Sequence, residues 1–131
     1  WHMTTTLDVF RNEKDVRTFD PGAVIFKEGD RGKVMFAVLE GEVNIVKSGV
    51  LLATLGPGEV FGEMALVDDS PRSADAVAKT ACKVAAVDDR SFLRMVAYNP
   101  QIALQLMSLL SERLRKANEE TVHHSAEHHT E

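Results

Sequence analysis

The sequence predicts a mainly β fold with flanking helices, specifically an antiparallel β-roll or jelly roll that carries a short helical insertion and ends in helices. Between Val16 and Val87, short apolar or alternating segments are separated by turn residues at close spacing, which is typical of antiparallel rolls and sandwiches. After Val87 the pattern changes to helical periodicity with two helix-start signals. At 131 residues, the chain is long enough for one domain with a proper core.

Seven or eight strands are expected from this pattern. Asp20-Pro21-Gly22 and Gly29–Gly32 have turn chemistry, and Glu40-Gly41 predicts a two-residue hairpin that pairs the strands on either side of it. The predicted strands are Val16–Phe19, Ala23–Phe26, Val34–Leu39, the alternating segment with Val43 and Ile45, Val50–Leu55, Ser73–Lys79 and Lys83–Val87.

Two helices are expected after the strands, over residues 89–98 and 100–121. Asp88 or Asp89 can cap the first helix, and its Phe92, Leu93 and Val96 are expected to face the roll. The second has Asn99 as cap and Pro100 at its first position. Its apolar residues form a heptad seam (Ala103, Met107, Leu110, Leu114 and Ala117) beside a second line (Ile102, Leu106 and Leu109). Two lines favour two partners, the roll and a second copy of the chain, although both lines could be buried intramolecularly.

The composition restricts the function classes. The net charge of −5 argues against a general nucleic-acid or anionic-membrane surface, so an anion site has to be a local pocket. No apolar run approaches the roughly 18 residues of a membrane helix, and we expect no signal peptide. The single Cys82 excludes an internal disulfide and a cysteine-based zinc site. It lies in an apolar run and is expected in the core, in a reducing, cytoplasmic compartment.

The two ends are expected to lie outside the folded domain of residues 7–121. Residues 1–6 resemble an expression remnant followed by a mobile N-terminus, and Leu7, Val9 and Phe10 could form a short N-terminal helix or arm. Residues 122–131 are a polar, histidine-rich tail. His124 and His128 are four residues apart, so a helix would place them on one face, but a solvated tail is favoured and no metal site is expected.

The strongest candidate site combines Gly62, Glu63 and Arg72 on one short stretch. Gly62 opens a single helical turn, whose first N–H groups can hold an anion. Arg72 supplies a planar fork of donors that suits a phosphate. Glu63, itself an anion, can accept hydrogen bonds from sugar hydroxyls. Each residue has an ordinary explanation alone, but together they indicate a ligand with both a phosphate and either a diol or a single ribose hydroxyl.

No catalytic constellation is expected, so the chain is predicted not to be an enzyme. The adjacent acid pairs Asp68-Asp69 and Asp88-Asp89 have no histidine nearby in sequence, and turn and cap roles explain them. Ser73 next to Arg72 is better interpreted as a hydroxyl donor to phosphate than as a nucleophile.

The stretch resembles the phosphate-binding cassette of the cyclic-nucleotide-binding domain family. The matching residues are Phe61–Leu66 and Arg72–Ala74, and the likeness continues through Ala78–Cys82 to Asn99-Pro100. It covers roughly residues 19–118 and is most similar to the sensor half of bacterial catabolite-activator-type regulators. The resemblance implies a β-roll with the cassette helix inserted between two strands.

The resemblance also implies a ligand, a 3′,5′-cyclic purine mononucleotide, with cAMP favoured over cGMP and no further cofactor. The implied ligand-binding residues are Phe61, Gly62, Glu63, Met64, Ala65, Arg72, Ser73, Ala74 and Asn118. The N–H groups of Met64 and Ala65 would bind the phosphate. Asn118 could pair with adenine, whereas Ala117 departs from the more polar residue of close relatives. Asp75 is another departure: pointing inward it would repel the phosphate, while strand alternation would place it with Ser73, opposite Ala74 and Ala76.

Ligand occupancy would be relayed through the C-terminal helix to an output domain or partner protein outside this chain, and the family's regulators commonly form homodimers through that helix. One alternative is a non-binding dimerisation or docking module of the same fold. Another is the sensor half of a transcription regulator, channel or kinase. The acidic charge makes this segment a poor nucleic-acid binder alone, and no membrane partner is expected.

Overall fold

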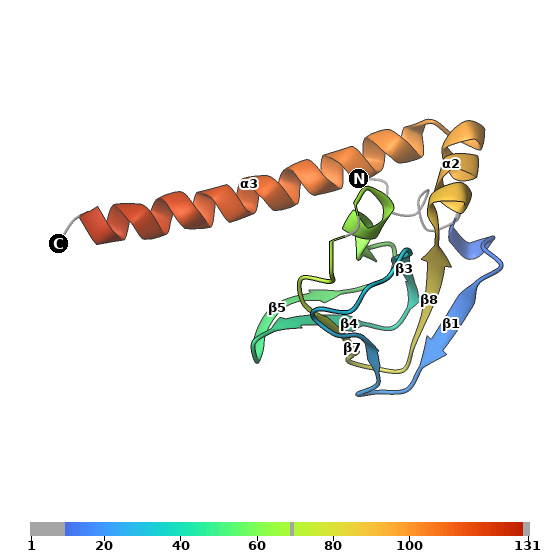
Figure 1. Cartoon of the computed structure of the whole chain (residues 1–131), viewed down its shortest axis with the longest axis horizontal. Helices are drawn as coiled ribbons and strands as arrows, with labels where there is room; N and C mark the ends of the chain where they lie inside the picture. Colours follow the sequence, from blue (N-terminus) through green and yellow to red (C-terminus); the bar gives the residue numbers. More distant parts are fainter. Residues whose placement is uncertain (1–9, 69, 130–131) are drawn as a thin grey trace. The chain divides into compact units, whose positions relative to one another are not determined.

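The computed structural model describes residues 10–68 and 70–129, with side chains described for residues 10–68 and 70–115. The chain divides into two compact units, Trp1–Arg94 and Met95–Glu131, and each is considered by itself. The first unit contains the strands and the second contains the long C-terminal helix (Figure 1). The N-terminal arm predicted from Leu7 and Val9 lies outside the described residues, but Phe10 is helical and buried.

The strands of the first unit form two four-stranded antiparallel sheets that face each other as a β-roll (Figure 1). One sheet has the order β1-β8-β3-β6 and the other the order β2-β7-β4-β5, so the predicted fold class is confirmed. The strands are β1 (Val16–Phe19), β2 (Val24–Phe26), β3 (Met35–Glu40), β4 (Val43–Lys47), β5 (Val50–Leu55), β6 (Val60–Phe61), β7 (Asp75–Ala78) and β8 (Cys82–Val87).

The hairpin predicted at Glu40-Gly41 is wrong. Strands β3 and β4 belong to different sheets, because β3 pairs with β6 and β8 whereas β4 pairs with β5 and β7. Gly41 turns a corner between the sheets: its φ is +82°, and a Cβ there would collide with the carbonyl oxygen of Ala81. The next residue, Glu42, donates its N–H to the hydroxyl of Thr80 at 3.0 Å, which ties the corner to the β7–β8 turn.

The core lies between the two sheets and includes an aromatic cluster. Phe36 stacks on Phe61 with ring centroids 5.3 Å apart, and Phe26 lies about equally close to both rings, at 6.0 and 5.9 Å. Strand β6, which the sequence analysis did not separate from the cassette, pairs Phe61 with Phe36 on β3. Cys82 is buried in the same core, as predicted, and burial raises the pKa of its thiol.

Helix α2 (Asp89–Tyr98) starts at the predicted cap, because the Asp88 carboxylate accepts the Ser91 N–H at 2.8 Å. The prediction for its apolar face is partly wrong. Phe92 and Val96 are half-buried, but Leu93 is 66% exposed and Met95 is buried instead. Positions 92, 95 and 96 share one face at helical spacing, and position 93 lies about 100° away from position 92.

Helix α3 (Gln101–His129) extends beyond the predicted end near residue 121. Its start matches the prediction, since the Asn99 side chain accepts the Gln101 N–H at 3.2 Å. Ile102 is buried, whereas Leu104, Met107 and Leu114 are 64, 63 and 64% exposed. Among the described residues, no helix has the combination of length and apolar character that crossing a bilayer requires.

We predict that the Asp88 cap makes the stability of the fold pH-dependent. The hydrogen bonds from Ser91 hold the pKa of Asp88 below its usual value. A carboxyl with a lowered pKa in the folded state stabilises above its unfolded pKa, and this stabilisation disappears as the pH falls through the folded value. Thermal unfolding followed by circular dichroism should show Asp88→Ala melting below the wild type at pH 7, with the gap shrinking as the pH falls below the usual Asp pKa of about 4 and through the lowered folded value.

Asp88→Asn is the matched control, because asparagine is also a good cap. It should stay close to the wild type at pH 7. A gap between Asp88→Ala and the wild type that stays constant from neutral to acid pH would contradict the assignment.

Candidate functional site

The cassette begins where β6 ends and the chain turns into a short 3₁₀ helix, η1 (Glu63–Leu66). Gly62 has φ +72° and ψ +20°, a left-handed conformation that favours glycine. Its carbonyl accepts the Ala65 N–H at 3.2 Å, which closes the first turn. The Ala65 N–H, expected to bind phosphate, is therefore used inside η1, and this turn would have to open before that N–H could reach a ligand.

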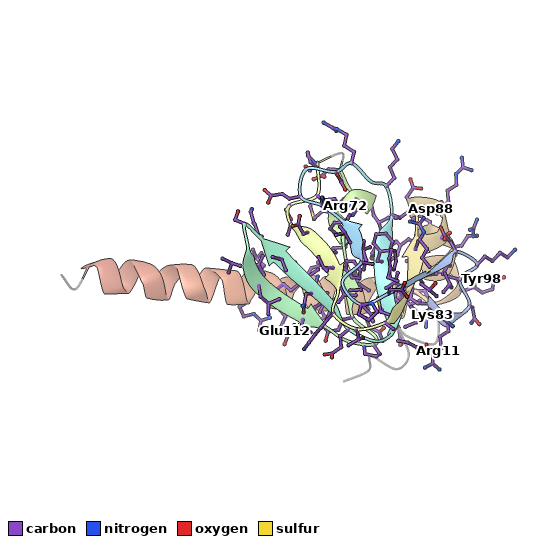
Figure 2. All side chains as sticks on the ribbon, turned by 90° about the horizontal axis from the view of Figure 1, so that it is seen from below. Arg11, Arg72, Lys83, Asp88, Tyr98 and Glu112 are labelled. Carbon is purple, nitrogen blue, oxygen red and sulfur yellow. The ribbon has the colours of Figure 1, made fainter. Side chains whose placement is uncertain are left out.

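Arg72 is buried, only 8% exposed, on the segment that leads into β7, and Figure 2 labels it beside the strands. Its Nη2 donates to the carbonyl oxygen of Val34 at 2.8 Å, and its Nη1 donates to the carbonyl oxygen of Gly62 at 3.1 Å. The guanidinium thus links the connection before β3 to the residue that opens η1. Gly62 and Arg72, which the sequence analysis placed in one candidate site, are therefore in direct contact.

Aromatic and acidic neighbours keep this buried charge in place. The Arg72 Cζ lies 4.4 Å from the centroid of the Phe26 ring and 5.8 Å from that of Phe36, and a desolvated cation–π contact is worth about 2 kcal/mol. Burial lowers the pKa of Arg72, while the carboxylates of Asp30 and Glu63 act in the opposite direction. An arginine stays protonated under these conditions, so the roll contains a fixed positive charge.

The Nε atom of the Arg72 guanidinium is buried and makes no hydrogen bond within the described residues. Carbonyls accept two of the five N–H donors of the fork, one from each Nη. A buried unsatisfied donor costs about 1–3 kcal/mol. An anion that accepted from Nε would remove this cost.

The backbone of Arg72 is held as firmly as its side chain. Its N–H donates to the carbonyl of Asp30 at 2.8 Å, and its carbonyl accepts the Gly29 N–H at 2.8 Å. Strand β7 begins only at Asp75, two residues later than predicted. Arg72 therefore precedes the strand, and its backbone bonds to Gly29 and Asp30.

A cavity of about 290 Å³ adjoins the guanidinium. Its lining includes Arg17, Arg31 and Arg72, with Asp30 as the one carboxylate and Phe26 and Gly32 beside it. One of these arginines, Arg17, is paired with Asp15 at 3.0 Å, and Arg72 is the buried one. The cavity is therefore a local space beside a buried guanidinium, on a chain whose net charge is −5.

The other predicted ligand-binding residues differ in exposure. Phe61 and Ala74 are buried, Glu63 and Ala65 are half-buried, and Met64 and Ser73 are exposed. Ala117 and Asn118 fall in the part of the helix for which side chains are not described. The contact between Arg72 and Gly62 is therefore the part of the predicted set that the structure brings together.

The direction of Asp75 follows from the register of β7. Its Oδ1 accepts the Glu28 N–H at 2.7 Å, whereas Ala74, Ala76 and Ala78 are buried on the other face of the strand. The carboxylate therefore binds the backbone just after β2, the strand that pairs with β7. It does not join the alanines in the core.

Sequence reasoning missed the residues that surround the guanidinium. Phe26, Asp30, Gly32 and Val34 were assigned only to strands and a turn, yet each contacts Arg72 or acts on its charge. Val34 contributes a backbone carbonyl, which no residue type signals. Gly32 has an ordinary explanation in sequence as a turn residue, and only its non-positive φ in the structure shows that the turn conformation does not need glycine there.

The acidic residues have structural partners. Asp68 accepts the Ser70 N–H at 2.9 Å, and Asp88 caps α2, as predicted; Asp69 lies outside the described residues. Among the described residues, no three His, Cys, Asp or Glu side chains come together as a metal site would require. The histidines from His123 onward have no described side chains.

Comparison with known proteins identifies the family. The family model for the cyclic nucleotide-binding domain matches residues 16–99. The cyclic AMP receptor protein of Thermus thermophilus is 38% identical over 107 residues, which are 78% of this chain and 50% of that protein. The chain spans about half the length of such relatives.

Solved structures agree with this match. The catabolite activator protein of Thermus thermophilus superposes with a TM-score of 0.74 and 36% identity, covering 89% of this chain and 55% of that one. A protein from a study of a cyclic-GMP-dependent pathway in bacterial phytopathogenesis superposes with a TM-score of 0.74 and 28% identity, covering 86% of this chain and 93% of the other. The chain belongs to the cyclic nucleotide-binding domain family.

Proposed function

We propose that this chain is a regulatory sensor domain that binds a 3′,5′-cyclic purine mononucleotide, with cAMP preferred over cGMP. The observation that carries the proposal is the buried guanidinium of Arg72, whose Nε has no partner among the described residues. A cyclic phosphate carries one negative charge, which matches one fixed guanidinium. A partly buried arginine–phosphate contact contributes on the order of 2–3 kcal/mol.

The remaining contacts follow from the cassette. The Ser73 hydroxyl is exposed one residue after Arg72 and can donate to the phosphate. The carboxylate of Glu63, at the start of η1, can accept from the ribose 2′-hydroxyl, which a deoxyribose lacks. The Met64 N–H follows Glu63 in η1, and the Ala65 N–H becomes available if the turn opens.

The proposed preference for cAMP is based on individual residues of this chain, because the names of its relatives include both cAMP and cGMP. One relative is named a cyclic AMP receptor, and another is a cGMP-dependent protein kinase of Toxoplasma gondii that is 38% identical over 113 residues. An asparagine such as Asn118 has both a donor and an acceptor for an adenine edge. Ser73 is compatible with either purine.

The signal would reach a reader outside this chain through α3. The relatives are about twice as long as the matched region, which supports an output domain or partner beyond it. A ligand shifts α3 only if it contacts the two states of the helix differently. The exposed side chains of Leu104, Met107 and Leu114 support a homodimer through this helix.

A second candidate is a docking module that binds no nucleotide. It is favoured by one specific observation: both Nη atoms of Arg72 bond to the protein's own carbonyls, so the residue could serve the fold alone. The two candidates differ in whether nucleotide binds at all.

Isothermal titration calorimetry with cAMP, cGMP and 2′-deoxy-cAMP tests the function. We expect the wild type to bind cAMP more tightly than cGMP and 2′-deoxy-cAMP. Arg72→Lys should weaken cAMP binding about 100-fold, because a lysine cannot offer the planar fork. Arg90→Ala, which removes an exposed arginine of α2, is the control and should bind as the wild type does.

The docking module would be supported if neither cyclic nucleotide gave heat or a thermal shift at millimolar concentration. Unchanged cAMP affinity in Arg72→Lys would refute the assignment of the phosphate to Arg72. Melting curves of each variant show whether it is folded.

Light scattering tests the dimer. The chain should have twice its 14.5 kDa mass in solution, and Met107→Glu combined with Leu114→Glu should produce a monomer, because two charges would be buried without partners. Met107→Leu keeps the apolar surface and should stay dimeric. A wild-type monomer at high micromolar concentration would contradict the dimer.

A further inference from the structure

The connection between β2 and β3 surrounds Arg72 although it lies about 40 residues earlier in the chain. Gly29 and Asp30 hold the Arg72 backbone through two hydrogen bonds of 2.8 Å. Val34 holds the Nη2 group at 2.8 Å. This connection therefore grips the residue at its backbone and at the end of its side chain.

Gly32 lies in the middle of this connection, against the guanidinium. A Cβ at position 32 would lie 2.5 Å from Nη2, 3.0 Å from Cζ and 3.1 Å from Nε of Arg72, and these are its three nearest heavy atoms. The backbone there is not in the positive-φ region, so alanine could adopt it. A side chain at position 32 would therefore displace the end of the Arg72 side chain.

Gly62 restricts the other end of the fork. A Cβ at this residue would lie 2.6 Å from Nη1, and its own carbonyl accepts from that nitrogen at 3.1 Å. The guanidinium thus fits between two bare backbone segments, with the Phe26 ring 4.4 Å from Cζ. Its position and its rotation are both fixed.

We propose that Gly32 and the Val34 carbonyl, together with Gly62, form a seat that positions the Arg72 guanidinium for the anion of the ligand. Gly32 is then a positioning residue for binding, although it lies outside the cassette. This inference rests on the proposed function.

The chemistry of the fork explains the benefit. Carbonyls accept one N–H from each Nη, and the buried Nε–H has no acceptor among the described residues. Nε–H and an adjacent Nη–H can bind a phosphate through two parallel hydrogen bonds once an anion reaches this buried edge. Because the seat immobilises the side chain beforehand, binding does not have to order it.

Gly32→Ala tests the seat, and Gly56→Ala is the matched control. Gly56 has no positive φ, and a Cβ there would meet no described atom within 4 Å. We expect Gly32→Ala to weaken cAMP binding about tenfold or more, since small misplacements of a binding group are costly. Gly56→Ala should leave the affinity within about twofold of the wild type.

A double-mutant cycle separates positioning from a general structural effect. In the Arg72→Lys background the fork that a Cβ would displace is gone, so adding Gly32→Ala should change cAMP affinity less than about twofold. Melting temperatures should show the same coupling: Gly32→Ala lowers the melting temperature when Arg72 is present and much less when lysine replaces it.

Two results would overturn the inference. One is a Gly32→Ala variant that binds cAMP as tightly as Gly56→Ala does, and the other is an equal loss of affinity in the wild-type and Arg72→Lys backgrounds. If the wild type binds cAMP while either result is found, only the seat is wrong. If the wild type binds neither cAMP nor cGMP, the proposed function fails, and any coupling left in the melting temperatures marks the seat as purely structural.

Discussion

The burial of one guanidinium is the constraint on which the site depends. Placing Arg72 inside the roll costs desolvation, and the protein offsets this cost with two backbone carbonyls, an aromatic face and two nearby carboxylates. In these contacts the guanidinium occupies the space that a Cβ at position 32 or 62 would take. The contacts also couple the start of η1 to the connection before β3. A ligand that binds the guanidinium of Arg72 therefore acts on both segments.

Local patterns predicted most of the elements. Val16–Phe19 and Val50–Leu55 match β1 and β5, and the cap at Asp88 was identified. Pairing was less accessible, because a turn such as Glu40-Gly41 shows where a strand ends but not which sheet the next strand joins. The prediction that Leu93 faces the roll was wrong, because an apolar residue at the edge of a helical face was assigned to that face.

The sequence predicted only the part of the site that residue types reveal, and not the part formed by backbone groups. Gly62 and Arg72 have functional residue types within ten positions of each other, and the structure joins them. The seat was invisible because its main contact is a backbone carbonyl 38 positions away in the chain. Asp75 was undecided in sequence, since its direction depends on where β7 begins and on the Glu28 N–H.

The most direct test of this account observes the Arg72 guanidinium itself. In protein with ¹⁵N-labelled arginine, the Nε–H resonance of Arg72 can be assigned by its loss in Arg72→Lys. The account predicts a slowly exchanging Nε–H in the free protein, because the group is buried, and a large shift of that resonance on adding cAMP but not adenosine. An Nε–H that exchanges as fast as those of exposed arginines, or one that stays unchanged at saturating cAMP, would contradict it.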